Sequence, residues 1–232
     1  WLFKTRHRGA QDLRIRTSLE IDAFAQIHRS WRRLGYPFDS LTPSYASAIG
    51  ASGDRPAALA ELIGIIANGG LRLPTQRIET LHFARDTPYE TRLEQGGEAG
   101  ERVLAGEVAQ TLRRVLVTVV EEGTARRLKG ALRAPDGSAI AVGGKTGTGD
   151  HRFKTMGQDG RVISERVLSR SATFVFTIGE RYFGTIMAYV QGAEAERYRF
   201  TSALPVQLLK SLGPPLLASL QGGGCSGGTA QP

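Results

Sequence analysis

The spacing of apolar residues changes at Asp136-Gly137, and this change constrains the fold of the chain more than any other feature of its sequence. Before this point, apolar residues recur at steps of three and four, which is the spacing of one helix face. After it come short apolar runs of high β-propensity, at residues 139–142, 172–178 and 182–190. Helices followed by strands predict an α+β fold, in which an antiparallel sheet packs with helices.

Two helices are predicted in the first third of the chain. The first covers about residues 17–34, and Thr17 and Glu20 at its start have the spacing of a capping box. The second begins near Pro56, which suits the first turn of a helix. It ends at Asn68-Gly69-Gly70, where the chain can adopt the positive φ of a helix stop.

A third helix is predicted at residues 106–122. Its apolar residues lie on one side, and they are Val108, Leu112, Val115, Leu116 and Val119. Between the second and third helices, residues 75–84 are predicted to be extended, and residues 90–100, rich in Gly and Glu, to be a surface loop.

The remaining strands and the last helix complete the expected fold. The runs 172–178 and 182–190 predict a hairpin, and residues 150–170 before it predict a polar loop, either a lid or an insertion. A closing helix is expected at about residues 201–212, and Pro214-Pro215 is expected to end the fold. The tail after Gln221 has the composition of a disordered segment.

Charge and composition narrow the function classes. The 232 residues include 30 Lys and Arg against 22 Asp and Glu, a net charge of +8. The cations are scattered rather than gathered on one face with aromatic residues, so we expect solvated helix faces and no nucleic-acid partner. No run approaches the eighteen apolar residues that a membrane span needs.

Metal and disulfide chemistry are not expected. Cys225 is the only cysteine, so neither an internal disulfide nor a metal site built from cysteines is possible. The histidines His7, His82 and His151 lie too far apart in the sequence to form a metal-binding pattern. We therefore predict no metal and no cofactor.

The segment Gly144–Gly149 carries the most distinctive chemistry, and three interpretations compete. A phosphate-binding loop would need a glycine where Ala139 stands, and a helix after residue 149 where Asp150–Phe153 do not begin one. A glycine-rich turn with a surface lysine is the plainest interpretation. The third is an edge strand that binds a carboxylate, with a charge from Lys145 and hydroxyls from Thr146 and Thr148.

In this third interpretation, each residue of the segment has a physical role. Gly147 lacks a Cβ, so a substrate can approach the backbone closely. The backbone N–H of Thr148 is a candidate donor to an oxyanion that develops during acyl transfer. Lys-Thr-Gly is also the third signature of penicillin-recognising acyl transferases, after Ser-x-x-Lys and Ser-x-Asn.

The order of several segments resembles the C-terminal part of the transpeptidase domain of class A penicillin-binding proteins. The resemblance covers roughly residues 18–215 and is carried by residues 41–52, 57–70, 144–149, 174–179, 184–190 and 201–212. It implies a partial penicillin-binding protein/β-lactamase-like fold with three sheet strands from this chain. It divides the chain into an upstream connection at 1–16, the transpeptidase part at 17–215 and a flexible tail at 216–232.

The resemblance implies serine acyl transfer that cross-links peptidoglycan stem peptides, with β-lactam antibiotics acylating the same serine. Lys145 and Thr148 would be catalytic, while Thr146, Gly147 and Thr148 would bind the terminal carboxylate of the substrate. The enzyme would work at the periplasmic face of the inner membrane, anchored by residues outside this chain.

Two of the three family signatures are missing. No Ser stands three residues before any of the five Lys, and Asn68, the only Asn, is not in Ser-x-Asn. The nucleophile is therefore expected upstream, and the isolated fragment is expected to be inactive. The alternatives are a non-catalytic peptidoglycan- or peptide-binding module, or a relative that is a β-lactamase or D,D-carboxypeptidase.

Overall fold

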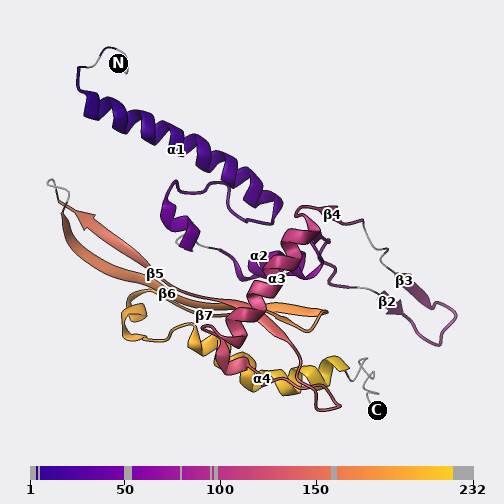
Figure 1. The fold of residues 1–232 in the computed structure, drawn as a ribbon. Coiled ribbons are helices and arrows are strands. Elements are labelled where there is room, and N and C mark those ends of the chain that lie inside the picture. The colour runs from indigo at the N-terminus through magenta and orange to yellow at the C-terminus, as the bar shows by residue number, and fades with distance from the viewer. Residues whose placement is uncertain are drawn as a thin grey trace.

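A computed structural model describes residues 4, 6–49, 54–78, 80–94, 96, 99–157 and 161–221 (Figure 1). Its helices are α1 (Arg8–Arg33), α2 (Pro56–Ala67), α3 (Gly106–Glu121) and α4 (Ala203–Gln221), with short 3-10 helices η1 (Tyr45–Ile49), η2 (Arg126–Leu128) and η3 (Ala193–Arg197). Its strands are β1 (Leu71–Arg72), β2 (Thr80–Phe83), β3 (Thr91–Glu94), β4 (Glu101–Arg102), β5 (Val142–Met156), β6 (Val162–Ile178) and β7 (Tyr182–Gln191).

The predicted sheet of three antiparallel strands is confirmed, with the order β5-β6-β7. Strands β5 and β6 pair from Val142↔Ile178 to Met156↔Val162. Strand β7 pairs with β6 only from Ile178↔Tyr182 to Ser169↔Gln191. The sheet is therefore three strands wide near the turn between β6 and β7. It is two strands wide where β6 runs from residue 162 to residue 168.

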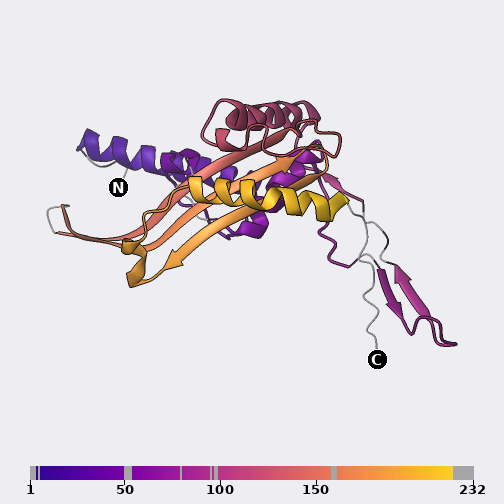
Figure 2. The same ribbon diagram turned by 90° about the horizontal axis from the view of Figure 1, so that it is seen from below.

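Helices cover both faces of the sheet (Figure 2). The face that carries Phe174, Phe176 and Ile178 forms the main core with α4, η2 and the end of α3. The opposite face lies against α3 and α2, because a Cβ on Gly143 would meet the backbone of α3 and one on Gly64 would meet the ring of Phe183. These contacts fix β5 between helices near its start.

The prediction of a polar loop at residues 150–170 is wrong. Strands β5 and β6 continue through it as a two-stranded ribbon, which we call the arm, defined as residues 150–157 and 161–170. The pairing contains irregularities between His151 and Arg152 and between Thr155 and Met156. Both faces of most of this ribbon are exposed, so no alternation of apolar residues revealed it as strand.

Two helix boundaries also differ from the sequence prediction. Helix α1 begins nine residues before Thr17, whose hydroxyl donates to the carbonyl of Leu13 inside the helix instead of capping it. Helix α4 continues through Pro214 and Pro215 to Gln221. Leu217 beyond the prolines is only 4% exposed, so burial against the core holds the helix together past them.

The remaining predictions have mixed outcomes. The extended segment within 75–84 is confirmed as β2, but part of the loop predicted at 90–100 is β3, its antiparallel partner. The α3 residues Val108, Leu112 and Val115 are exposed among the described residues, while Ala109 and Val120 are the buried ones. The tail predicted after Gln221 and Cys225 lie outside the described residues, and the domain boundaries stay predictions.

Candidate functional site

The segment Lys145–Gly149 lies on β5, an edge strand of the sheet. The residue before this segment is Gly144. A larger residue would not fit there, because a Cβ would lie 2.5 Å from the carbonyl oxygen of Val175. No atom lies within 4 Å of a Cβ built on Gly147, so the strand is open to approach at this point. Side chains alternate between the two faces of a strand, which places Lys145 and Thr146 on opposite faces.

Lys145 is exposed, and its ammonium bends back along the strand. Its Nζ donates a hydrogen bond to the carbonyl oxygen of Thr146 at 2.6 Å. The side chain lies at the open edge of the sheet, as the edge-strand interpretation expects. Two hollows of the described chain lie elsewhere, one between α1 and Tyr45 and one beside Gln76, Arg77, Ile78 and Thr80.

Thr146 is the buried member of the segment, with 8% of its surface exposed. Its Oγ1 lies 2.7 Å from Oγ1 of Thr124, and either hydroxyl can donate. Thr124 follows the end of α3, so this hydrogen bond ties the loop after α3 to the candidate site. Thr124 is not among the site residues predicted from the sequence.

Thr148 is exposed and is linked to the start of α4. Its Oγ1 accepts a hydrogen bond from the backbone N–H of Ser202 at 2.9 Å, directly before the first residue of α4. A hydroxyl has one O–H donor in addition to its acceptor lone pairs. Thr148 therefore keeps its own proton for a ligand, beside a helix N-terminus that favours negative charge.

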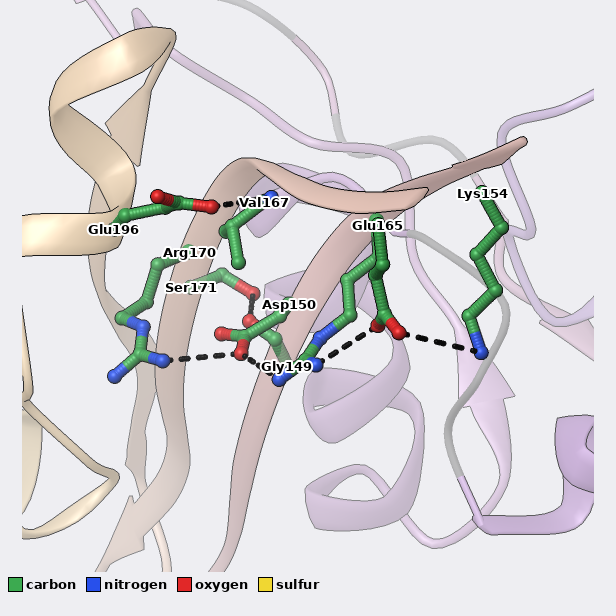
Figure 3. A network of polar contacts seen from close by, with 9 residues as sticks. Gly149, Asp150, Lys154, Glu165, Val167, Arg170, Ser171 and Glu196 are labelled. Atoms are coloured by element: carbon green, nitrogen blue, oxygen red, sulfur yellow. Dashed lines mark hydrogen bonds and ion pairs between the residues drawn. The ribbon is translucent and has the colours of Figure 1, made fainter. Parts of the chain in front are cut away.

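A network of ion pairs begins at Asp150, two residues beyond Thr148 (Figure 3). Oδ2 of Asp150 lies 3.0 Å from Nη2 of Arg152 and 3.0 Å from Nη2 of Arg170. Arg152 also contacts Glu165 at 2.9 Å. Asp150 and Arg170 come from opposite strands, so the network joins β5 to β6 where β7 ends.

The network shifts the pKa of both carboxyl groups. Burial by itself raises the pKa of Asp150, but hydrogen bonds and charges from Arg152 and Arg170 outweigh it and lower the pKa overall. A hydrogen bond from Arg152 is the main cause that lowers the pKa of Glu165. Both groups are therefore carboxylates at neutral pH.

The predicted site residues thus lie on one strand but not on one face of it. Lys145 and Gly147 lie on the exposed side, Thr146 is held inside by Thr124, and Thr148 is anchored to α4. Within the part of the chain that the structure describes, no cluster of metal-binding side chains and no helix long and apolar enough to cross a membrane is present.

Comparison with known proteins identifies the family. The model of the penicillin-binding protein transpeptidase domain matches residues 25–166, which is more than half of the 232 residues and includes the Lys-Thr-Gly segment. The chain belongs to the penicillin-binding protein transpeptidase family. Its sequence is 29% identical over 140 residues to penicillin-binding protein 1B of Escherichia coli, covering 60% of this chain and 16% of that protein.

Solved structures of penicillin-binding proteins share the fold. PBPA from Mycobacterium tuberculosis has a TM-score of 0.54 at 20% identity, covering 81% of this chain and 44% of that chain. Penicillin-binding protein 3 from the same organism, complexed with aztreonam, has a TM-score of 0.53 at 18% identity, with coverages of 84% and 46%.

A third similar structure is penicillin-binding protein 1A from Haemophilus influenzae. Its TM-score is 0.52 at 20% identity, covering 79% of this chain and 30% of that chain. The predicted α+β fold is confirmed, and the matches to 1A and 1B proteins are consistent with the class A type. The chain spans less than half the length of these relatives.

Proposed function

We propose that this chain is part of a peptidoglycan D,D-transpeptidase whose serine nucleophile lies outside these residues. The position of Lys145–Thr148 on an open edge strand carries the proposal, because an extended peptide can approach such a strand directly. Family membership supports serine acyl transfer as the reaction. The stem peptide would be the acyl donor, and β-lactams would acylate the same serine.

In the proposed reaction, the serine oxygen attacks the carbonyl of the penultimate D-Ala, and the bond to the terminal D-Ala breaks. The amine of a neighbouring stem peptide then takes the acyl group and releases the serine. Lys145 supplies positive charge near the terminal carboxylate, and the hydroxyl of Thr148 donates to that carboxylate. The Thr148 N–H stabilises the oxyanion, a role whose loss typically costs about 3 kcal/mol of activation free energy.

Thr146 takes a different part in this proposal from the one the resemblance implies. Because its hydroxyl is buried against Thr124, it holds the strand in place beside the substrate and presents its backbone to it. Thr148 and Gly147 then remain as the residues that meet the carboxylate and the peptide backbone.

A non-catalytic binding module is the second candidate. Such a module would keep the Lys-Thr-Gly strand for recognition of a peptide or of peptidoglycan and would have no Ser-x-x-Lys anywhere in the full-length protein. A β-lactamase or D,D-carboxypeptidase would use the same edge strand and differ in how the acyl-enzyme is resolved. The proposed site of action is the periplasmic face of the inner membrane.

The test is acylation of the full-length protein by a fluorescent penicillin. We expect Lys145→Ala to slow acylation by at least about tenfold, the loss expected for one charge-assisted hydrogen bond, with an unchanged melting temperature. Lys210→Ala, an exposed lysine on α4, is the control and should acylate at the wild-type rate. Equal acylation by wild type and Lys145→Ala would refute the role of Lys145, and no acylation of the wild type would favour the binding module.

A further inference from the structure

The outer edge of β5 continues without interruption from the candidate site into the arm. Strand β5 spans Val142 to Met156 and is paired on one side only, with β6. Among the described residues, no backbone group outside β6 hydrogen-bonds to the backbone of this strand, although the N–H of Ser202 reaches the side chain of Thr148. Unpaired strand edges are templates for another extended chain. The open edge, at 15 residues, is thus about three times as long as the Lys145–Gly149 segment.

The opposite edge of the arm is covered where it leaves the sheet. The N–H of Val167 donates to Oε1 of Glu196 at 3.3 Å (Figure 3). The N–H of Gly192 donates to the carbonyl of Leu168 at 2.8 Å. Natural proteins commonly block strand edges in this way. The arm therefore has one blocked edge at its base, on β6, and one open edge, on β5.

The side chains of the arm carry an excess of positive charge. Among the described residues, three cations, Arg152, Lys154 and Arg170, share the two carboxylates of Asp150 and Glu165. Lys154 is the most weakly held, since its Nζ lies 4.0 Å from Glu165 and its side chain is 52% exposed. Figure 3 shows Lys154 at the end of the network, with Glu165 between it and Asp150. This lysine is the cation best placed to meet a carboxylate from outside.

We propose that the open β5 edge of the arm, at residues 150–156, binds the acidic, extended part of the donor peptide that precedes its D-Ala-D-Ala end. The inference rests on the proposed function, which places the terminal carboxylate at Lys145–Thr148. A peptide that starts there and follows the edge runs antiparallel to β5. At about 3.3 Å per residue, the arm edge is roughly 20 Å long and accommodates about six further residues.

The experiment is hydrogen exchange on the full-length protein with three synthetic peptides. The probes are acetyl-Glu-Ala-Glu-Ala-D-Ala-D-Ala, the same peptide with Gln in place of Glu, and acetyl-D-Ala-D-Ala. We expect the acidic hexapeptide to slow exchange at 150–156 and the short peptide to leave the arm unchanged. Lys154→Gln should weaken binding of the acidic peptide by about two- to fivefold, as expected for an exposed ion pair.

The controls isolate the lysine charge. Lys210→Gln should bind the acidic peptide as the wild type does, and Lys154→Gln should not change binding of the glutamine peptide. Protection at 145–148 without protection of the arm, together with wild-type affinity in Lys154→Gln, would overturn this inference and leave the proposed function standing. Protection of the arm but not of 145–148 would overturn the assignment to the donor peptide. No protection at either segment would count against the proposed function itself.

Discussion

The hydroxyl contact between Thr124 and Thr146 should be a measurable stabilising interaction. Thr124→Val and Thr146→Val each remove one hydroxyl and keep a branched side chain. The two Oγ1 atoms lie 2.7 Å apart, so either change removes this hydrogen bond. Thr124→Val leaves the hydroxyl of Thr146, which is only 8% exposed, without a partner, whereas Thr146→Val leaves the hydroxyl of Thr124, an exposed residue. We expect each single variant to lower the free energy of unfolding by about 1 kcal/mol.

The double variant separates this hydrogen bond from general effects of the two substitutions. When both hydroxyls are gone, no partner is left unpaired, so the loss should be smaller than the sum of the single losses by about 1 kcal/mol. The assay is urea unfolding of the wild type, both single variants and the double variant. Losses that add to within about 0.3 kcal/mol would refute the reasoning.

The same contact should matter for the proposed chemistry. If Thr124 fixes the strand beside Lys145, then Thr124→Val should also slow acylation by a labelled penicillin roughly two- to tenfold, the equivalent of one lost hydrogen bond. Glu122→Gln, an exposed change two residues away, is the control for the loop after α3 and should acylate normally.

Four further substitutions test the ion pairs and the packing around the site and in α4. Asp150→Asn should lower the free energy of unfolding by about 1 kcal/mol after solvent screening. The pKa of Asp150 is lowered on folding, so the stabilising effect of its carboxylate is present above the unfolded pKa and is lost as pH falls through the folded pKa. Gly144→Ala should cost about 1–3 kcal/mol through overpacking, whereas Gly147→Ala, with open space at its Cβ, should leave stability unchanged and slow acylation. Leu217→Ala should cost about 2–5 kcal/mol, because this side chain is 4% exposed.

Each of these has a contrasting result that counts against it. Asp150→Asn should flatten the acid side of a stability-versus-pH curve, and an unchanged curve would show that the network contributes nothing. Equal melting temperatures for Gly144→Ala and Gly147→Ala would contradict the close approach at Gly144. Leu216→Ala, at a more exposed neighbouring position, should cost clearly less than Leu217→Ala, and the reverse order would mean that α4 does not pack beyond its prolines.

Local patterns in the sequence predicted the elements whose residues face a core. The runs at 172–178 and 182–190 were recognisable as strands because β6 and β7 bury part of their length under helices. The arm was missed because it is stabilised by cross-strand pairs such as Asp150–Arg170, which are charged residues in a sequence and become a pattern only once the strands are paired.

Tertiary contacts decided the features that local signals predicted wrongly. Pro214 and Pro215 are helix breakers by propensity, yet α4 continues through them, and Leu217 beyond them packs into the core. Thr17 has the spacing of a cap, but the helix continues upstream and its hydroxyl turns back to Leu13. The contact of Thr124 with Thr146 joins residues 22 positions apart, so no short-range signal pointed to it.

The apolar side of α3 has a practical consequence for work with this chain. Val108, Leu112 and Val115 lie exposed along a helix that packs on β5, and the edge of β5 is itself unpaired. Adjacent exposed apolar side chains and a free strand edge both promote self-association at high concentration. Expression of these residues alone should therefore yield oligomers and precipitate, and charged substitutions on α3 are the direct route to a protein that remains monodisperse.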